Sequence, residues 1–352
     1  MQPPLVSVNM PVYNGAAYIG QAIDSIVQQT YPHWELIVVN DASTDDTVQI
    51  VNAFKDDRIK LIHNKKQLGL AHVRNVGVAA SAGKYIAILD SDDVAGKDRL
   101  AVQVAFLESH PQHCLVCSWV NAIDANGVHI SQQRHAFADA ELSTVLFFHN
   151  CIAQSSVMLR RSMLPDEAPY DPAFPPSEDY QLWVRMLRKH PAHLMQQTLL
   201  HYRVHKANSS AKNRTVTDAA VQNVLRMQCN ELGLTHFTEK DFGLHFSLTY
   251  NCYGTSYEYL ANCNAFYQQI IKANRTKKIF DQQVLLKMIR HYLQKPMQQY
   301  FVKKQYSMAD VQALYSKSLN AAFYLPAGST AKIILKGLTS YKPGSGVGAI
   351  AV

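Results

Sequence analysis

The sequence lacks the features that mark membrane-spanning and disulfide-bonded proteins. No apolar run approaches the roughly 20 residues that a spanning helix needs. The six cysteines are scattered, and the close pair Cys114 and Cys117 stands without a second pair at the spacing of zinc ligands. The start, MQPPLVSVNM, has neither the basic segment nor the cleavage site of a signal peptide. These absences predict a cytoplasmic protein with reduced cysteines, whose CxxC packs in the core.

Acidic residues are scarce in the second part of the chain. Residues 206–352 contain 18 Lys and Arg but 7 Asp and Glu, a net charge of +11, whereas residues 1–205 carry a net charge of −4. This asymmetry favours different partners for the two parts, and anionic lipid head groups or an anionic polymer are candidates for the basic part. A well-solvated helical surface explains the same charge. No motif for nucleic-acid binding accompanies it, so no nucleic-acid partner is predicted.

The first 110 residues alternate between strand-like and helix-like segments. Apolar, β-branched runs predict strands, and apolar residues at helical spacing predict the helices between them. This alternation predicts an α/β fold with a mostly parallel sheet, in which the loops at the carboxyl ends of the strands gather along one edge. The predicted strands are residues 5–12, 34–41, 58–64 and 84–90, and the predicted helices are residues 15–29, 43–54, 70–81 and 97–110.

The pattern changes after residue 111. The run HCLVCSWVNAID, an Asn-Gly turn and the run VHISQQ predict a β-hairpin. Strand character returns at residues 155–161 and 193–205, with a helix predicted at residues 175–190 between them. The segment NCIAQSS, residues 150–156, precedes one of these strands, and we expect it on the acceptor side of any ligand site. Beyond residue 206 the chain is predicted to be mostly helical.

Polar side chains follow three of the predicted strands. Asn14, Asp41 and Asp90 each come just after a strand, so we expect them at the same edge of the sheet. The run DSDD adds Asp92 and Asp93, and carboxylates this close repel one another unless a cation joins them. Their hard oxygens suit Mg²⁺ or Mn²⁺, and the spacing of Asp90 and Asp92 lets both face one ligand. An exposed acidic turn before the next helix explains the run equally well.

Several other polar residues have ordinary explanations when each is taken alone. Glu178 and Asp179 open a predicted helix, where acids are commonly partners of the helix dipole. Arg74 lies on a helix beside the same edge of the sheet, where it can pair with phosphate or with the acids. Arg203 and His205 come later, and a lone histidine is more often structural than a metal ligand.

Together, these residues form an ordered set of motifs. The motifs are PVYN, VNDASTDDT, GLAHVRNVG, AILDSDD, SEDYQLWVR and YRVH. In this order and at this spacing, the chain resembles the inverting family 2 glycosyltransferases of bacterial cell-surface polysaccharide and lipopolysaccharide synthesis, which have the GT-A fold. The motifs cover residues 4–210. We therefore predict a GT-A glycosyltransferase domain in residues 1–210 and a basic, mostly helical C-terminal extension in residues 211–352.

The resemblance implies a role for each matched residue. It implies a divalent cofactor, Mn²⁺ or Mg²⁺, and a metal-dependent transfer with inversion from a nucleotide-sugar donor, most simply a UDP-sugar, to a glycan or lipid-linked acceptor. The implied nucleotide-binding residues are Pro11, Tyr13, Asn14, Asp41, Arg74, Asp90 and Arg203. The implied metal ligands are Asp92, Asp90 and His205, and the implied catalytic residues are Asp179, as general base, and Glu178, which would orient the acceptor or Asp179.

Other classes of function are less consistent with the sequence. A sugar nucleotidyltransferase needs a Gly-rich loop with basic residues directly after the first strand, and YNGAAYIG has no basic residue. A catalytically inactive glycan- or nucleotide-binding module would be expected to have lost acids of the DxD pair, Asp90 and Asp92, or of the ED pair, Glu178 and Asp179. Both pairs are intact. For residues 211–352, peripheral contact with an anionic membrane, oligomerisation and acceptor positioning are the alternatives.

Overall fold

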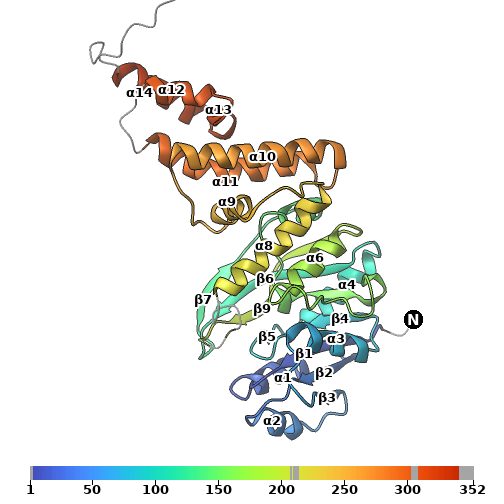
Figure 1. The fold of residues 1–352 in the computed structure, drawn as a ribbon. Helices are drawn as coiled ribbons and strands as arrows, with labels where there is room; N and C mark the ends of the chain where they lie inside the picture. Colours follow the sequence, from blue (N-terminus) through green and yellow to red (C-terminus); the bar gives the residue numbers. More distant parts are fainter. Residues whose placement is uncertain (1–2, 207, 209–213, 303–307, 341–352) are drawn as a thin grey trace, which may run out of the picture. The chain divides into compact units, whose positions relative to one another are not determined.

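The chain folds into two compact units, Met1–Val224 and Leu225–Val352. The computed structural model (Figure 1) describes residues 3–206, 208, 214–302 and 308–340. Helix α8 (Arg214–Glu231) runs across the division between the units. The domain boundary at residue 210 stays a prediction.

The first half of the first unit is the predicted parallel α/β sheet. Its strands are hydrogen-bonded in the order β3-β2-β1-β4, with all three pairings parallel. Helix α3 packs on β1 and β2. The predicted strands and helices of this region are confirmed, each slightly shorter than predicted. They are β1 (Val6–Val12), α1 (Ile19–Val27), β2 (Trp34–Asn40), α2 (Thr47–Ala53), β3 (Ile59–His63), α3 (Leu70–Ala80), β4 (Tyr85–Ile88) and α4 (Arg99–Ser109).

The second half extends the same sheet with mixed pairings. β8 lies antiparallel to β4, β6 lies antiparallel to β8, and β9 runs parallel to β6. β7 pairs with β6 and confirms the predicted hairpin, whereas the short β5 pairs with β9. The elements are β5 (Val94–Ala95), β6 (Leu115–Ile123), β7 (His129–Gln133), α5 (Asp139–Val145), the 3₁₀ turn η1 (Gln154–Ser156), β8 (Met158–Arg160), the 3₁₀ turn η2 (Arg161–Met163), α6 (Glu178–Leu187) and β9 (Ala192–Arg203).

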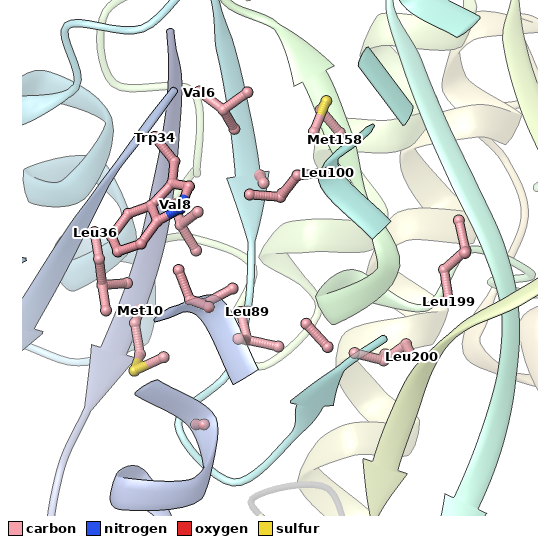
Figure 2. Packing of buried hydrophobic residues seen from close by; sticks show 14 of the residues in the cluster. Val6, Val8, Met10, Trp34, Leu36, Leu89, Leu100, Met158, Leu199 and Leu200 are labelled. Carbon is pink, nitrogen blue, oxygen red and sulfur yellow. The ribbon is translucent and has the colours of Figure 1, made fainter. Parts of the chain in front are cut away.

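The main hydrophobic core lies against the central strands (Figure 2). Every residue of β1 and β2 is buried, as expected for parallel strands that are covered on both faces. The CxxC is confirmed as core packing, because Cys114 and Cys117 are both fully buried. Burial raises the pKa of the Cys114 thiol to about 12, which keeps it unreactive. The core includes Val6, Val8, Met10, Trp34, Leu36, Leu89, Leu100, Met158, Leu199 and Leu200.

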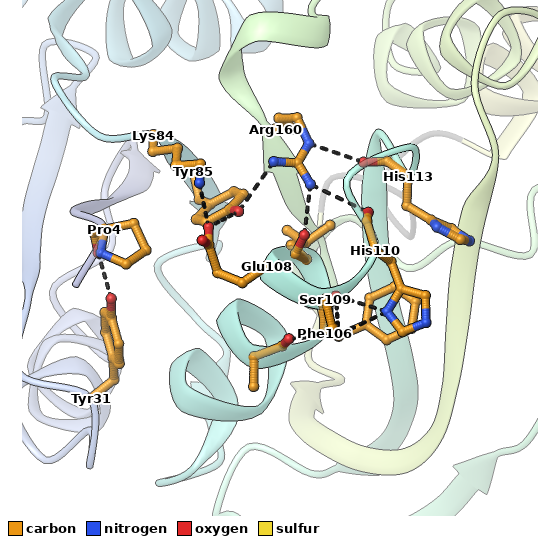
Figure 3. Close-up of polar contacts among 12 residues, drawn as sticks. Pro4, Tyr31, Lys84, Tyr85, Phe106, Glu108, Ser109, His110, His113 and Arg160 are labelled. Atoms are coloured by element: carbon orange, nitrogen blue, oxygen red, sulfur yellow. Dashed lines mark hydrogen bonds and ion pairs between the residues drawn. The ribbon is translucent and has the colours of Figure 1, made fainter. Parts of the chain in front are cut away.

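A buried arginine ties β8 to the rest of the sheet (Figure 3). Arg160 is 7% exposed, and its guanidinium donates to the carbonyls of Leu107 and His113 at 2.7 and 3.3 Å. It also donates to the Tyr85 hydroxyl at 3.2 Å, and that hydroxyl in turn donates to Glu108. Because Tyr85 begins β4, this network fixes the strand that ends just before Asp90.

The second unit is helical, which confirms the predicted helical extension. Helices α10 and α11 pack against each other, and the buried Asn274 shapes the turn between them. The Asn274 side chain donates to the carbonyl of Phe280 at 3.0 Å and accepts from its amide at 2.8 Å. Within the described ranges, no helix is both long enough and apolar enough to span a membrane. The helices are α9 (Glu239–Thr249), α10 (Tyr257–Lys277), α11 (Gln282–Val302), α12 (Met308–Tyr315), α13 (Ala321–Tyr324) and α14 (Ala327–Ser340).

Candidate active site

A cavity of about 1300 Å³ opens at the carboxyl ends of β1, β2 and β4. This is the edge of an α/β sheet at which ligands bind, and the volume exceeds that of an ordinary small-molecule pocket. Two of the sequence-predicted site residues, Glu178 and Arg203, do not line it. The others do, and they are Pro11, Tyr13, Asn14, Asp41, Arg74, Asp90, Asp92, Asp179 and His205.

The loops that follow β1 and β2 are hydrogen-bonded to each other. The Asn14 amide donates to the Ser43 hydroxyl at 2.9 Å, and the Asn14 side chain accepts from the Thr44 amide at 2.8 Å. Asn14 has φ of 51°, a left-handed conformation that asparagine tolerates better than most residues. The crosslinked loops present Tyr13, which is 47% exposed, at the cavity. Its exposed ring is suited to stacking on a nucleotide base.

Asp41 is buried and its carboxylate is used by the protein. It accepts hydrogen bonds from the side chain of Asn64 at 2.9 Å and from the amides of Leu68 and Gly69 at 2.9 and 3.0 Å. These bonds hold the 64–69 loop at the cavity and set the start of α3. Contact between Asp41 and a nucleotide base stays a prediction.

Arg74 joins the acids of two separate motifs. It is 6% exposed on α3, and its guanidinium pairs with Glu178 and, at 3.4 Å, with Asp90. Burial opposes its charge, but the negative charges of Asp90, Glu178 and Asp179 outweigh burial and raise the pKa of Arg74. Glu178 is 1% exposed and does not line the cavity, so it is connected to the cavity through its ion pair with Arg74, which does. Direct contact of Arg74 with a nucleotide, and of Glu178 with an acceptor, both stay predictions.

Asp179 lies at the wall of the cavity, in the first turn of α6. One carboxylate oxygen accepts from the Tyr180 amide at 2.7 Å. Burial raises the pKa of Asp179 to about 7; Arg74 opposes this rise, and the charge of Glu178 adds to it. A carboxylate with a pKa close to neutral pH is well matched to accept a proton from a substrate.

The DSDD run separates into two partly exposed acids and one buried acid. The side chains of Asp90 and Asp92 are 29% and 26% exposed, and Asp92 contacts the His205 ring nitrogen Nε2 at 2.9 Å. Burial and the charge of Asp90 raise the pKa of Asp92, although His205 opposes this. Asp93 is fully buried and accepts from the Arg203 amide at 2.9 Å. Its other carboxylate oxygen has no hydrogen-bond partner among the residues that the structure describes.

A divalent cation fits the chemistry of Asp90 and Asp92. Both offer hard oxygen donors to the cavity, and a cation would remove the repulsion that raises the pKa of Asp92. In the part of the chain that the structure describes, no three His, Cys, Asp or Glu side chains are already gathered around a metal position. Oxygens of a bound diphosphate, together with water, would complete the coordination, as is usual for Mg²⁺.

Arg203 is buried beneath the cavity and bonded to protein acceptors. Its guanidinium donates to the Gln21 side chain at 2.7 Å and to the carbonyls of Asp92 and Asp124 at 2.9 and 3.3 Å. It also lies over the ring of Tyr18, 4.7 Å from the centroid. These contacts support the backbone of the DSDD loop, and a direct contact with a diphosphate would require some of them to be exchanged. The nucleotide-binding role of Arg203 stays a prediction.

Three cavity residues were not singled out from the sequence. The Tyr18 and His205 rings are in tilted contact, 46° apart with centroids separated by 4.8 Å, and the Ser155 hydroxyl accepts from the Asp90 amide at 3.0 Å. Gln154 is buried in the wall beside Ser155. The segment expected on the acceptor side does line the cavity, from Asn150 to Ser155. Its 3₁₀ turn is too short to have a periodic pattern, so the sequence predicts the segment but not the individual residues.

Comparisons with known proteins agree with this fold. The family model described as glycosyl transferase family 2 matches residues 7–165. An uncharacterised glycosyltransferase of Methanocaldococcus jannaschii is 33% identical over 210 residues, which are 58% of this chain and 72% of that protein. The Escherichia coli UDP-Glc:alpha-D-GlcNAc-diphosphoundecaprenol beta-1,3-glucosyltransferase WfgD is 32% identical over 191 residues, which are 53% of this chain and 72% of WfgD.

Solved structures agree on the fold. The crystal structure of Staphylococcus aureus TarS 1–349 in complex with UDP-GlcNAc has a TM-score of 0.57 at 19% identity. The match covers 78% of this chain and 88% of the TarS chain. The predicted α/β fold of the GT-A type is therefore confirmed. From the motifs in their order, the sheet that brings them to one edge, and these relatives, the chain belongs to glycosyl transferase family 2 and is a glycosyltransferase.

Proposed function

We propose that this enzyme transfers a sugar, with inversion, from a UDP-sugar to a glycan or lipid-linked acceptor in cell-surface polysaccharide synthesis. The observation that carries the proposal is that Asp179, whose pKa burial raises to about 7, shares one cavity with the partly exposed pair Asp90 and Asp92. The name of WfgD gives UDP-Glc as donor and a diphosphoundecaprenol-linked acceptor, and TarS has been crystallised with UDP-GlcNAc and with UDP. Contact of residues 211–352 with an anionic membrane, and oligomerisation, stay predictions.

The residues of the cavity divide the chemistry between them. An acceptor hydroxyl is a poor nucleophile, and Asp179 takes its proton as the oxygen attacks the anomeric carbon. The bond from that carbon to the diphosphate breaks, and the electron pair leaves with the nucleoside diphosphate. Arg74 keeps the acids around the reacting groups in place through its ion pairs with Asp90 and Glu178. A single displacement of this kind turns an α-linked donor into a β-linked product.

Asp90 and Asp92 would hold the divalent cation, with His205 beside Asp92. A bound Mg²⁺ or Mn²⁺ supplies positive charge that stabilises the negative charge of the departing diphosphate. The support for this assignment is the donor chemistry of the two partly exposed carboxylates, together with the mutual repulsion that a cation would relieve.

The rate of transfer is expected to rise with pH through about 7. Asp179 accepts a proton only in its ionised form, and burial raises its pKa to about 7, so the active fraction grows as pH increases past that value. The measurement is kcat/KM at constant ionic strength from pH 5 to pH 9. If activity instead falls only at lower pH, with an apparent pKa near 4, the essential base is an unperturbed carboxylate.

The configuration of the product tests the proposed reaction. UDP-glucose and UDP-GlcNAc, both α-linked, are incubated with the enzyme and Mn²⁺ without acceptor, and the free sugar formed by transfer to water is followed by proton NMR before mutarotation. A single displacement assisted by Asp179 predicts the β-anomer as the first product. An α-anomer formed first would show retention of configuration, which a single displacement from the opposite face cannot give, and would contradict the assigned role of Asp179.

A further inference from the structure

A buried glutamine in the cavity wall has half of its amide unpaired. Gln154 belongs to η1, is 8% exposed and lines the cavity. Its Nε2 donates to the Tyr170 hydroxyl at 3.1 Å, whereas its Oε1 has no hydrogen-bond partner among the described residues. An unpaired buried oxygen is costly, and the cost is removed when a ligand supplies the missing donor.

Tyr170 holds this glutamine to the helix that carries Arg74. It is fully buried, and its backbone makes two hydrogen bonds with the Asn75 side chain, at 2.7 and 3.0 Å. Its ring lies beside the Arg74 guanidinium, 5.6 Å from the centroid. A single side chain therefore connects α3 to η1, and its hydroxyl leaves Gln154 little freedom to turn away from the wall.

The neighbours of Gln154 indicate which part of a ligand it would meet. Ser155, the next residue, accepts from the Asp90 amide at 3.0 Å, so Gln154 lies beside the acids assigned to the diphosphate end of the sugar. Tyr13 and Asp41 follow the other two strands that end at the cavity and belong to the part assigned to the base. The group closest to Gln154 would then be the sugar itself, whose hydroxyls and acetamido N–H are donors of the kind that Oε1 lacks.

We propose that Gln154 binds the transferred sugar by accepting a hydrogen bond from one of its hydroxyl or N–H groups, and that Tyr170 is the positioning residue for Gln154. This proposal rests on the proposed function, because it assigns the sugar end of the same donor site. A site that accepts a hydrogen bond from one hydroxyl or N–H group of the sugar discriminates against sugars that lack that group, since the buried oxygen would then stay unpaired. Gln154 is thus a determinant of which sugar is transferred.

The test compares UDP with UDP-sugars on the full chain. Calorimetry with Mn²⁺ gives the dissociation constants of UDP, UDP-glucose and UDP-GlcNAc for the wild type and for Gln154→Leu. We expect the variant to bind at least one of the two UDP-sugars about tenfold more weakly, because the loss of one hydrogen bond leaves a group of the sugar unpaired. We expect it to bind UDP as the wild type does. Equal ratios of UDP-sugar to UDP affinity in both proteins, for both sugars, would overturn the proposal.

Tyr170→Phe separates positioning from general stability. It keeps the ring beside Arg74 and removes only the hydroxyl that accepts from Gln154, so it should weaken UDP-sugar binding severalfold and leave UDP binding unchanged. Added to Gln154→Leu it should have no further effect, because both act through one contact. Tyr31→Phe, which loses a hydroxyl bond to the Pro4 carbonyl outside the cavity, is the matched control (Figure 3) and should change neither affinity.

The outcomes separate this inference from the proposed function. If the wild type binds no uridine nucleotide, the donor assignment fails and the role of Gln154 fails with it. If UDP and UDP-sugars bind but Gln154→Leu changes both affinities equally, or neither, the donor site stands and the sugar contact is wrong. Fully additive losses in the Gln154→Leu, Tyr170→Phe double variant would show that Tyr170 does not act through Gln154.

Discussion

Replacement of Asp179 by asparagine is expected to lower kcat by about 10²–10⁴-fold and to leave the affinity for UDP unchanged. The amide keeps the size of the side chain and can still accept from the Tyr180 amide, but it cannot take a proton from an acceptor hydroxyl. The native carboxyl also keeps its proton to a higher pH than the carboxyl of the unfolded chain does. Ionised Asp179 therefore lowers stability at pH 8, and the variant should melt at the same temperature or higher there.

Steady-state rates and melting curves together decide this prediction. Asp171→Asn is the matched control, because Asp171 caps its own loop by accepting from the Ala173 amide and does not line the cavity. It should retain wild-type turnover. An Asp179→Asn enzyme with near-normal turnover would show that Asp179 is not the general base. Loss of UDP binding in that variant would mean that Asp179 belongs to the donor site.

Replacement of Arg74 by methionine is expected to destabilise the first unit by about 3–5 kcal/mol. The substitution leaves Glu178, which is 1% exposed, as an unpaired buried charge and deprives Asp90 of its partner. It also removes the positive charge that opposes the rise in the pKa of Asp179. Any folded variant should therefore have its acidic limb of activity shifted to higher pH, an effect that a loss of packing alone would not produce.

Urea unfolding of paired variants checks the magnitude. Lys84→Met is the surface control, since Lys84 and Glu108 are 49% and 42% exposed in their pair and such pairs contribute about 0–1 kcal/mol. Addition of Glu178→Leu to Arg74→Met should recover part of the lost stability but not the activity, because it removes the unpaired charge without restoring the contact with Asp90. A loss below about 1 kcal/mol for Arg74→Met would contradict the importance of this ion pair.

The sequence predicts the frame of the site better than the details of its contacts. Strand ends followed by Asn14, Asp41 and Asp90 were sufficient to place three loops at one edge, because parallel crossovers leave no other arrangement. The partners of Arg203 were not predictable, since two of them are carbonyls of Asp92 and Asp124, and carbonyl oxygens leave no mark in a sequence.

The sequence does not indicate how the burial of Glu178 differs from that of Asp179. Adjacent acids in the first turn of a helix look alike in a sequence, and the fold alone decides that Glu178 faces Arg74 whereas Asp179 faces the cavity. The sequence does not indicate Gln154 as a site residue, for a related reason. Its pairing with Tyr170 joins segments that are separate in the sequence, and only the packed chain shows that one half of its amide is left for a ligand.

The melting temperature in the presence of UDP shows whether the cavity binds a nucleotide together with a divalent cation. Wild-type protein and Asp92→Asn are melted with UDP alone, with UDP and Mn²⁺ or Mg²⁺, and with UDP and EDTA. A ligand that binds only the native state raises the melting temperature. We expect the melting temperature of the wild type to rise with UDP and a divalent cation and to rise less or not at all with EDTA. For Asp92→Asn we expect no metal-dependent increase. The absence of any increase with UDP under all conditions would contradict the assignment of this cavity as a nucleotide-sugar site.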